Sequence, residues 1–327
     1  MSASCVDPLP HQLRFVGPGD RSPASRSHPL MPEEFVRRLH FKGFDYDCRI
    51  VENPAPRTEP IVLLGGSFQD MYAFRRLEKP WTEVATVITV DLPGSGKADD
   101  LPAEYGFDFL AEVLGDLLEQ LELGPVNLFA ASYGVPIAYR LVQQRPERVK
   151  RLMLAGASME YPAECRTALR AMVDSLASGG ISSAYGQVTV EALMAHPDRP
   201  VRKRAVTARL LACTMSAITE ADVPRHAAIL ERVLATPGLP PGGIPDVPTL
   251  CFTGEFDEFS TPDRVREVAA TIQQGQFSLI READHLPNLE RGKEFSRLIA
   301  DYFTDQPLDT LDFLTEVERP ALERVPA

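Results

Sequence analysis

Three side chains that could form a nucleophilic site each follow a short apolar run of the sequence. Ser132 follows VNLFAA, Asp257 follows TLCFTGEF, and His285 ends the stretch QFSLIREADH. A serine hydroxyl is a weak nucleophile at neutral pH, so it needs a base, and the base needs an acid that fixes its tautomer. Ser, Asp, His is also the chain order of one class of such triads. The sequence therefore predicts acyl transfer on Ser132, with His285 as base and Asp257 as orienting acid.

The residues around Ser132 favour an exposed nucleophile on a tight turn. A strand that turns directly into a helix can present a serine above the sheet only if the residues two before and two after it are small. These positions hold Ala130 and Gly134. Alanine departs from the G-x-S-x-G pattern, although it is still small. Taken alone, the motif also fits a serine that caps a helix after a strand.

Two other acidic residues could take the place of Asp257, whereas no other histidine holds a position comparable with that of His285. Glu255 and Glu258 flank Asp257 in the same predicted loop. The other histidines come too early in the chain or fall in a helical segment between strands; they are His11, His28, His40, His196 and His226. We therefore expect His285 to be the base and Asp257 to be preferred over the two glutamates.

Acyl transfer also needs two N–H donors for the tetrahedral oxyanion. One should be the backbone N–H of Tyr133, at the start of the helix that follows the nucleophile. The other should come from the loop after IVLL, from Ser67 or, second, from Phe68. Gly65 and Gly66 would let that backbone approach closely, although they also fit an ordinary tight turn.

The elements that would position these residues alternate along the chain. Continuous apolar runs are typical of strands buried on both faces of a parallel sheet, and apolar stripes at three- and four-residue steps indicate helices between them. The fold class predicted is α/β: a mostly parallel, doubly wound, eight-stranded sheet with an inserted helical cap. The strands are expected at 36–42, 46–52, 61–64, 86–90, 126–130, 150–155, 249–253 and 276–280.

The same patterns divide the chain into four regions. Residues 1–32, rich in Pro, Ser and Gly, predict a flexible N-terminal arm. Residues 33–160 and 247–303 would form the sheet core, and residues 161–246 the helical cap, with helices near 164–176, 201–218 and 224–235. Residues 304–327 are expected to be an acidic, solvated C-terminal extension.

Composition limits the partners. A formal net charge of −12 argues against a general nucleic-acid or anionic-membrane surface. The apolar runs are too short to span a membrane, and the start of the sequence lacks the pattern of a secretory signal, so we expect a cytoplasmic location. Five scattered cysteines without C-x-x-C spacing predict reduced thiols. No metal or redox-cofactor motif is visible, and we expect no cofactor.

Two stretches have competing interpretations. Gly94-Ser95-Gly96-Lys97 looks like part of a phosphate loop, but Asp91 and Ala98 stand where a glycine and a Ser/Thr are required, so that interpretation fails. The basic cluster, Arg199, Arg202, Lys203 and Arg204, fits a solvated helix face. It also fits a clamp for the phosphates of a coenzyme A or carrier-protein thioester.

Apolar and basic residues in or near the cap supply candidates for substrate binding. Met159, Tyr161 and Met172, with Leu211 and Met215, could form an apolar acyl pocket, although such residues also pack helices. Arg202 and Lys203 are the basic candidates for contact with a phosphorylated leaving group.

Several motifs together resemble a known superfamily. The segments LLGGSF, VDLPGSGKAD, AASYG, FTGEFDEFSTPD and READH resemble the α/β-hydrolase superfamily over roughly residues 35–303. Ala98 replaces a usual serine, and Asp284 replaces the glycine before the histidine. The stretch PTLCFTGEFDEFSTPDRVRE with GQFSLIREADH is similar to the branch containing the hydroxyalkanoyloxy-alkanoate synthase and the 3-hydroxyacyl-carrier-protein:CoA transacylase. That resemblance implies an acyl carrier protein or coenzyme A as a possible partner.

Three functions share these residues. The first is a serine hydrolase that cleaves an ester or thioester through an acyl-enzyme on Ser132. The second is an acyltransferase that moves a (3-hydroxy)acyl group from a thioester to an alcohol or thiol. The third is a ligand-binding module whose triad is idle.

Overall fold

The computed structural model describes residues 33–177 and 183–321. The predicted N-terminal arm, residues 1–32, lies outside the described residues, as do residues 322–327 of the predicted extension. Within the described part, no helix combines the length and apolarity needed to cross a membrane.

The described residues form an eight-stranded sheet in the order β1-β2-β4-β3-β5-β6-β7-β8. β2 is antiparallel to both its neighbours, and the pairs from β4 to β8 are parallel. Each strand lies within two residues of its predicted bounds, so the prediction of a mostly parallel eight-stranded sheet is confirmed. The strands are Glu34–Phe41 (β1), Phe44–Val51 (β2), Ile61–Leu64 (β3), Val87–Asp91 (β4), Val126–Ala131 (β5), Val149–Ala155 (β6), Thr249–Gly254 (β7) and Gly275–Ile280 (β8).

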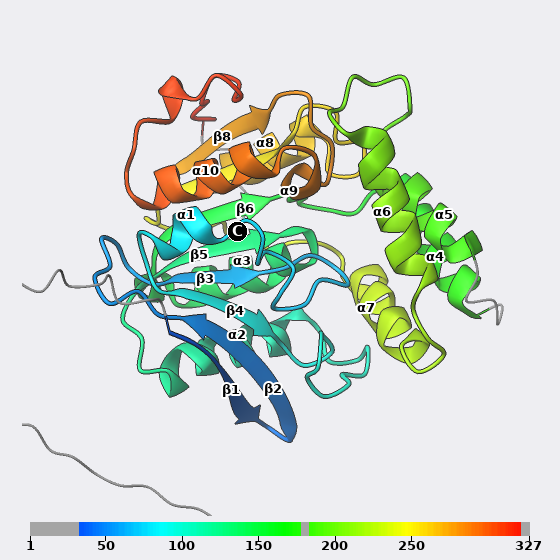
Figure 1. Ribbon diagram of the computed structural model, residues 1–327, viewed down its shortest axis with the longest axis horizontal. Coiled ribbons are helices and arrows are strands. Elements are labelled where there is room, and N and C mark those ends of the chain that lie inside the picture. Colours follow the sequence, from blue (N-terminus) through cyan, green and yellow to red (C-terminus); the bar gives the residue numbers. More distant parts are fainter. Residues whose placement is uncertain (1–32, 178–182, 322–327) are drawn as a thin grey trace, which may run out of the picture. The chain divides into compact units, whose positions relative to one another are not determined.

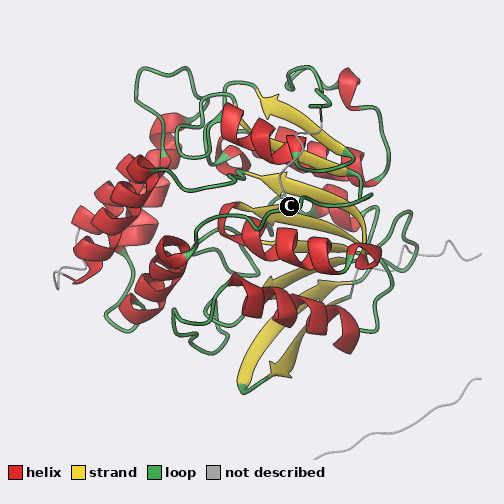
Figure 2. Cartoon of the chain, turned by 180° about the vertical axis from the view of Figure 1, so that it is seen from behind, coloured by secondary structure: helices red, strands yellow, loops and turns green. Residues whose placement is uncertain are grey.

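Helices cover both faces of the sheet, which is why the central strands are apolar throughout (Figures 1 and 2). One face packs against α2 (Phe107–Gln120), α3 (Val135–Gln144) and α8 (Pro262–Ala270). The other packs against α1 (Lys79–Thr82) and α10 (Gly292–Phe303). Two apolar cores therefore hold the sheet rigid, one on each side, and the carboxyl ends of the parallel strands are left for function.

Four helices are inserted between β6 and β7: α4 (Ala163–Ala177), α5 (Ser183–Leu193), α6 (Arg204–Ser216) and α7 (Val223–Ala235). We call α4–α7 the helical insertion. In Figure 1 it lies beyond the arrowheads of the parallel strands, at the edge where their carboxyl ends meet. Three of these helices fall on segments predicted to be helical, with α6 starting later than expected, at Arg204. The division of the chain into regions remains a prediction.

Helix α5 was not among the predicted helices. Its sequence contains Gly186 and the β-branched run Val188, Thr189 and Val190, residue types that are weak helix formers. Tertiary packing explains the glycine, because a Cβ at Gly186 would lie 2.4 Å from the carbonyl oxygen of Ala212 in α6. The close approach of α5 and α6 therefore outweighs the weak local preference.

The expectation of a solvated C-terminal extension is wrong for the described residues 304–321. Leu311, Phe313 and Leu314 are buried in the core beside α10. Glu318 exchanges both backbone hydrogen bonds with Phe277 of β8, at 2.8 and 2.9 Å. The segment is acidic, but its apolar residues cover the open edge of the sheet, and edge strands commonly need such cover.

Candidate active site

Ser132 lies on a sharp turn between β5 and α3, in the short helix η1 (Ser132–Gly134). Its φ of +46° is in the left-handed region, which residues with side chains rarely adopt. The turn depends on Gly134: a Cβ there would lie 2.8 Å from the Cβ of Leu64 and 2.9 Å from the carbonyl oxygen of Gly65. The strained backbone holds the Ser132 side chain at the wall of a cavity.

Asp257 lies in the loop after β7 and is almost fully buried. Its Oδ1 accepts the backbone N–H groups of Phe259 at 2.9 Å and Ser260 at 2.7 Å. Its Oδ2 accepts the hydroxyl of Thr253 and lies 2.8 Å from Nδ1 of His285. The carboxylate is thus held in one orientation, with one oxygen directed at the imidazole.

His285, in the loop after β8, joins the aspartate to the serine. Its Nε2 lies 3.2 Å from Oγ of Ser132, while Nδ1 faces Asp257. Burial alone would lower the pKa of His285, but the charge and hydrogen bond of Asp257, with the charges of Asp284 and Glu290, outweigh it, so the pKa is raised above its ordinary value. The three side chains therefore form a continuous hydrogen-bonded series in the order Asp257, His285, Ser132.

Both rival acids are engaged elsewhere. Glu255 accepts the backbone N–H of Glu282 at 2.9 Å. Glu258 accepts the backbone N–H of His196 and the guanidinium of Arg199, at 3.3 and 3.4 Å. Among the described side chains, Asp257 is the carboxylate that contacts the imidazole of His285.

The loop after β3 brings the predicted oxyanion donors to the serine. A Cβ on Gly66 would lie 3.5 Å from the Cβ of Ser132, so the backbone passes directly beside it. Gly66 itself donates its N–H to Oε1 of Gln69 at 2.7 Å. Ser67 and Phe68 line the same cavity as Ser132, and within the described chain no acceptor takes either of their N–H groups. Both remain candidates, together with Tyr133.

A cavity of about 540 Å³ opens beside Ser132 and His285. Its walls come from the loops at the carboxyl ends of the strands and from the helical insertion, and most of the lining side chains are apolar. Of the predicted pocket residues, the structure brings four to the cavity: Tyr161, Met172, Leu211 and Met215.

Three other predicted substrate contacts are not among the lining residues. The backbone carbonyl of Met159 accepts the N–H of Leu239 at 2.8 Å, in an isolated bridge outside the cavity. Arg202 is half-exposed and binds Glu282 at 2.6 Å. Lys203 is the N-cap residue just before α6, in the left-handed conformation and with its side chain exposed. The prediction that Arg202 and Lys203 face the substrate is not supported, because ion pairing and the start of a helix hold them on the surface.

The remaining arginines of the basic cluster are also engaged. Arg199 lies 3.4 Å from Glu258, and Arg204 donates twice to the backbone carbonyl of Ala195, at 2.9 and 2.6 Å. The Arg199–Glu258 pair attaches the loop between α5 and α6 to the core, whereas the Arg204 bonds to Ala195 close that loop onto α6. The cluster therefore acts as a set of tethers for the helical insertion, which is closer to the solvated-face interpretation than to a phosphate clamp.

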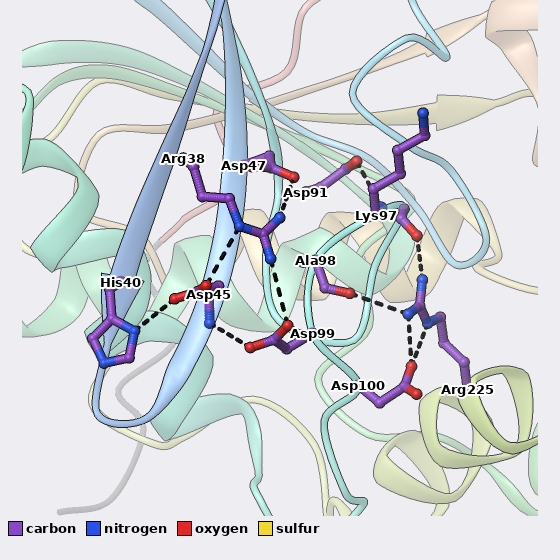
Figure 3. A network of polar contacts seen from close by, with 11 residues as sticks. Arg38, His40, Asp45, Asp47, Asp91, Lys97, Ala98, Asp99, Asp100 and Arg225 are labelled. Carbon is purple, nitrogen blue, oxygen red and sulfur yellow. Dashed lines mark hydrogen bonds and ion pairs between the residues drawn. The ribbon is translucent and has the colours of Figure 1, made fainter.

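The glycine-rich loop after β4 is fixed from both sides (Figure 3). Asp91 accepts the backbone N–H of Lys97 at 3.2 Å, which closes the turn. Asp99 accepts a backbone N–H of β2 at 2.7 Å. From the other side, Arg225 of α7 binds Asp100 at 2.7 Å and donates to two backbone carbonyls of the loop. The loop thus connects the sheet to the helical insertion and forms part of the cavity wall.

His226 is a cavity residue that the sequence did not single out, beyond excluding it as the base. Its ring stacks on that of Phe68, with centroids 4.3 Å apart and an interplanar angle of 17°. Burial lowers its pKa to about 4, so the imidazole is neutral near pH 7. The stack connects α7 to the loop that carries the candidate oxyanion donors.

Two buried acids beside His285 were also missed. Asp284 accepts the backbone N–H groups of His285 at 2.7 Å and of Ala195 at 2.5 Å. Glu290 accepts the backbone N–H of Asp284 at 2.7 Å. Burial raises the pKa of Asp284 to about 6 and that of Glu290 to about 8. The one available signal was Asp284, at the position where the superfamily that these motifs resemble has glycine.

Comparison with known proteins agrees with this architecture. A family model described as "alpha/beta hydrolase fold" matches residues 59–179. The (E)-2-((N-methylformamido)methylene)succinate hydrolase of Acinetobacter baylyi is 24% identical over 257 residues, covering 76% of this chain and 92% of the relative. A poly(3-hydroxyalkanoate) depolymerase of Ectopseudomonas oleovorans is 29% identical over 135 residues, covering 39% of this chain and 45% of the relative.

Among solved structures, MGS-M2, an α/β hydrolase enzyme from a Medee basin deep-sea metagenome library, superimposes with a TM-score of 0.73. The two chains are 19% identical, and the match covers 83% of this chain and 98% of the other. Together with the sheet order and the helical insertion, these matches define the class of fold: the chain has the α/β-hydrolase fold.

The site has no visible provision for a metal. Among the described residues, no group of three or more His, Cys, Asp or Glu side chains is arranged to hold a metal ion.

Proposed function

We propose that this protein is a serine hydrolase that cleaves carboxylic esters with an apolar acyl group through an acyl-enzyme on Ser132. One observation carries the proposal: His285 lies 3.2 Å from Oγ of Ser132 through Nε2 and 2.8 Å from Asp257 through Nδ1, beside an apolar cavity. The names of two relatives, a hydrolase and a poly(3-hydroxyalkanoate) depolymerase, agree with hydrolysis, and the polymer named in the second is a polyester.

In the first half-reaction, Oγ of Ser132 attacks the carbonyl carbon of the ester while its proton passes to Nε2 of His285. Asp257 stabilises the imidazolium that forms. The carbonyl oxygen becomes an oxyanion, which the backbone N–H groups of Tyr133 and of Ser67 or Phe68 would bind. When the tetrahedral intermediate collapses, the C–O bond to the alcohol breaks, and His285 donates its proton to the leaving oxygen.

In the second half-reaction, water attacks the acyl carbon and gives a proton to His285. A second tetrahedral intermediate collapses by breaking the bond to Oγ, which regains the proton. The carboxylic acid leaves and Ser132 is restored. The same three side chains serve both halves, so loss of one should impair the whole cycle.

The cavity favours a substrate that has an apolar acyl group and lacks a polyanionic leaving group. Leu169, Met172, Leu211, Met215 and Ile229 line it from the helical insertion. The guanidinium among its lining residues, that of Arg225, is already bound to Asp100 and to loop carbonyls. No cation of the described cavity wall is thus left to bind the phosphates of coenzyme A. This observation favours a simple ester over the carrier-protein or coenzyme A alternative.

The test is to incubate the protein with a fluorophosphonate and with a panel of p-nitrophenyl esters and acyl thioesters, with and without alcohols and coenzyme A as acceptors. We expect an adduct on Ser132, hydrolysis of the esters and no adduct with Ser132→Ala. Transfer of the acyl group to an added acceptor in preference to water would instead support the acyltransferase. No adduct with the folded wild type would support the idle ligand-binding module.

A further inference from the structure

Two arginine side chains in the described chain are each only 1% exposed, Arg49 and Arg232, and they differ in their partners. Arg49 is surrounded by acids: Glu78 binds it at 2.7 Å and Glu34 at 2.8 Å. For Arg232, of α7, no carboxylate of the described residues lies within ion-pair distance. A buried charge without a counter-charge is unfavourable. The positive charge of Arg232 at this place therefore indicates a functional role.

Neutral oxygens from two segments hold the Arg232 guanidinium. Its Nε donates to the carbonyl of Tyr105 at 2.6 Å, and Nη2 donates to those of Leu101 and Pro102 at 2.9 and 3.0 Å. These three carbonyls belong to the loop after β4. Its Nη1 donates to the hydroxyl of Tyr133 at 2.6 Å. The guanidinium is therefore fixed in one orientation, between the cavity-wall loop and the nucleophile turn.

Tyr133 is the residue next to Ser132, and its backbone N–H is a proposed oxyanion donor. Its ring is buried against Phe107, with centroids 5.1 Å apart, and burial raises the pKa of its phenol, which stays neutral. The short bond to Arg232 prevents the ring from rotating away. Through this side chain, the position of the Ser132–Tyr133 peptide depends on a residue in the helical insertion.

We propose that Arg232 is a positioning residue for the oxyanion side of this site. It holds Tyr133 in place, and its unneutralised positive charge favours the negative charge that develops on the substrate oxygen. The inference rests on the proposed function. Preorganised charge of this kind acts on the transition state more than on the bound ester, since the ester carries no charge.

The experiment measures kcat and KM for p-nitrophenyl esters and the affinity of an alkyl trifluoromethyl ketone. Oγ of Ser132 adds to the ketone carbon, its proton passes to His285, and the ketone oxygen becomes an anion. The secondary alcohol of the same chain length fills the cavity without that anion. The variants are Arg232→Met, Arg232→Lys and Tyr133→Phe. Arg166→Met is the matched control, because Arg166 also donates to three backbone carbonyls, of Tyr161, Leu234 and Thr236, but not to Tyr133.

We expect Arg232→Met to lower kcat roughly 10-fold to 100-fold, with KM within about threefold. Affinity for the trifluoromethyl ketone should fall in parallel, and affinity for the alcohol should not change. Arg232→Lys should recover part of the loss, Tyr133→Phe should show a smaller loss of the same kind, and Arg166→Met should behave as the wild type.

A folded Arg232→Met protein with wild-type kcat, or one that loses ketone and alcohol affinity equally, would overturn the inference. If Arg232→Met does not fold, Tyr133→Phe tests the inference in its place. An unchanged kcat and an unchanged affinity for the ketone in Tyr133→Phe would then overturn the inference. Failure of the proposed function is distinguishable, because Ser132→Ala would then retain turnover. An inactive Ser132→Ala beside a fully active Arg232→Met overturns only the role of Arg232.

Discussion

The carboxyl group of Glu290 accepts the backbone N–H of Asp284, the residue immediately before His285, at 2.7 Å. Asp284 in turn accepts the N–H of His285, so two buried acids fix the backbone that carries the imidazole. Neither acid contacts the imidazole through a hydrogen bond in the structure. Their geometry points to support of the histidine loop, and their ionisation should appear in the pH dependence of stability.

Glu290→Gln should reduce the loss of stability at alkaline pH. The pKa of Glu290 is raised from 4.5 to about 8, so the folded protein binds more protons than the unfolded chain between these values. Stability therefore falls as pH rises through this interval. Each unit of pKa corresponds to about 1.4 kcal/mol, so the wild type should lose on the order of 3 to 4 kcal/mol more than the variant between pH 5 and 8. Urea unfolding across that range measures the difference.

The control is Glu267→Gln, which removes an exposed carboxylate on α8. It should leave the pH dependence of unfolding as in the wild type. Identical pH dependence for Glu290→Gln and the wild type would contradict the assignment of a buried, protonated Glu290.

Asp257→Asn should lower activity and move its pH dependence. His285 must be neutral to accept the proton of Ser132, so kcat/KM should rise with pH through the pKa of His285, which lies above its ordinary 6.5. Without the charge of Asp257, the largest contribution that raises this pKa is lost, and the pKa falls. We expect kcat about 10³- to 10⁴-fold lower, with the acidic limb of the kcat/KM profile at lower pH. An acidic limb at unchanged pH would argue that Asp257 does not act on His285.

The stack of His226 on Phe68 should influence turnover through shape and not through protonation. Because the pKa of His226 is lowered to about 4, His226 should contribute no limb to the activity profile between pH 5 and 9. His226→Phe keeps an aromatic partner and should retain kcat/KM within about threefold. In His226→Ala, kcat/KM should fall about 2- to 10-fold, which corresponds to the interaction free energy of an aromatic pair. Equal losses in both variants would show that the ring nitrogens matter more than the stack.

Leu211→Trp should select against long acyl chains. Leu211 lines the cavity from α6, and the larger ring would occupy space that a long chain needs. We expect kcat/KM for an octanoate ester to fall about tenfold, because crowding a packed apolar site is unfavourable by about that much. The kcat/KM for an acetate ester should change by no more than about threefold. Val206→Trp, at an exposed position of the same helix, is the control. If both esters lose activity equally, the acyl chain does not lie against Leu211.

The sequence allowed the sheet and the meeting of Ser132, Asp257 and His285 to be predicted for one physical reason. Ser132, Asp257 and His285 each follow a buried parallel strand, and the carboxyl ends of parallel strands share one edge of a sheet. The residues that support them could not be predicted this way. Arg232, His226 and Glu290 act through tertiary contacts with Tyr133, Phe68 and Asp284, and no local periodicity encodes such pairs.

Surface and terminal residues were the other source of error. Arg202 has the type of side chain that contacts phosphates, but its ion pair with Glu282 depends on how the helical insertion meets the core. Similarly, the acidic character of residues 304–321 hid the buried Phe313 and Leu314. In both cases, the charge along the sequence did not reveal which side chains form ion pairs and which become buried.

The most direct test of the proposed mechanism is to quench the reaction with a p-nitrophenyl ester within the first turnovers and map the acyl group by peptide mass spectrometry. We predict that the peptide containing Ser132 carries one acyl group, and that Ser132→Ala carries none and hydrolyses the ester at background rate. An acyl group on a different residue, or undiminished turnover by Ser132→Ala, would contradict the mechanism.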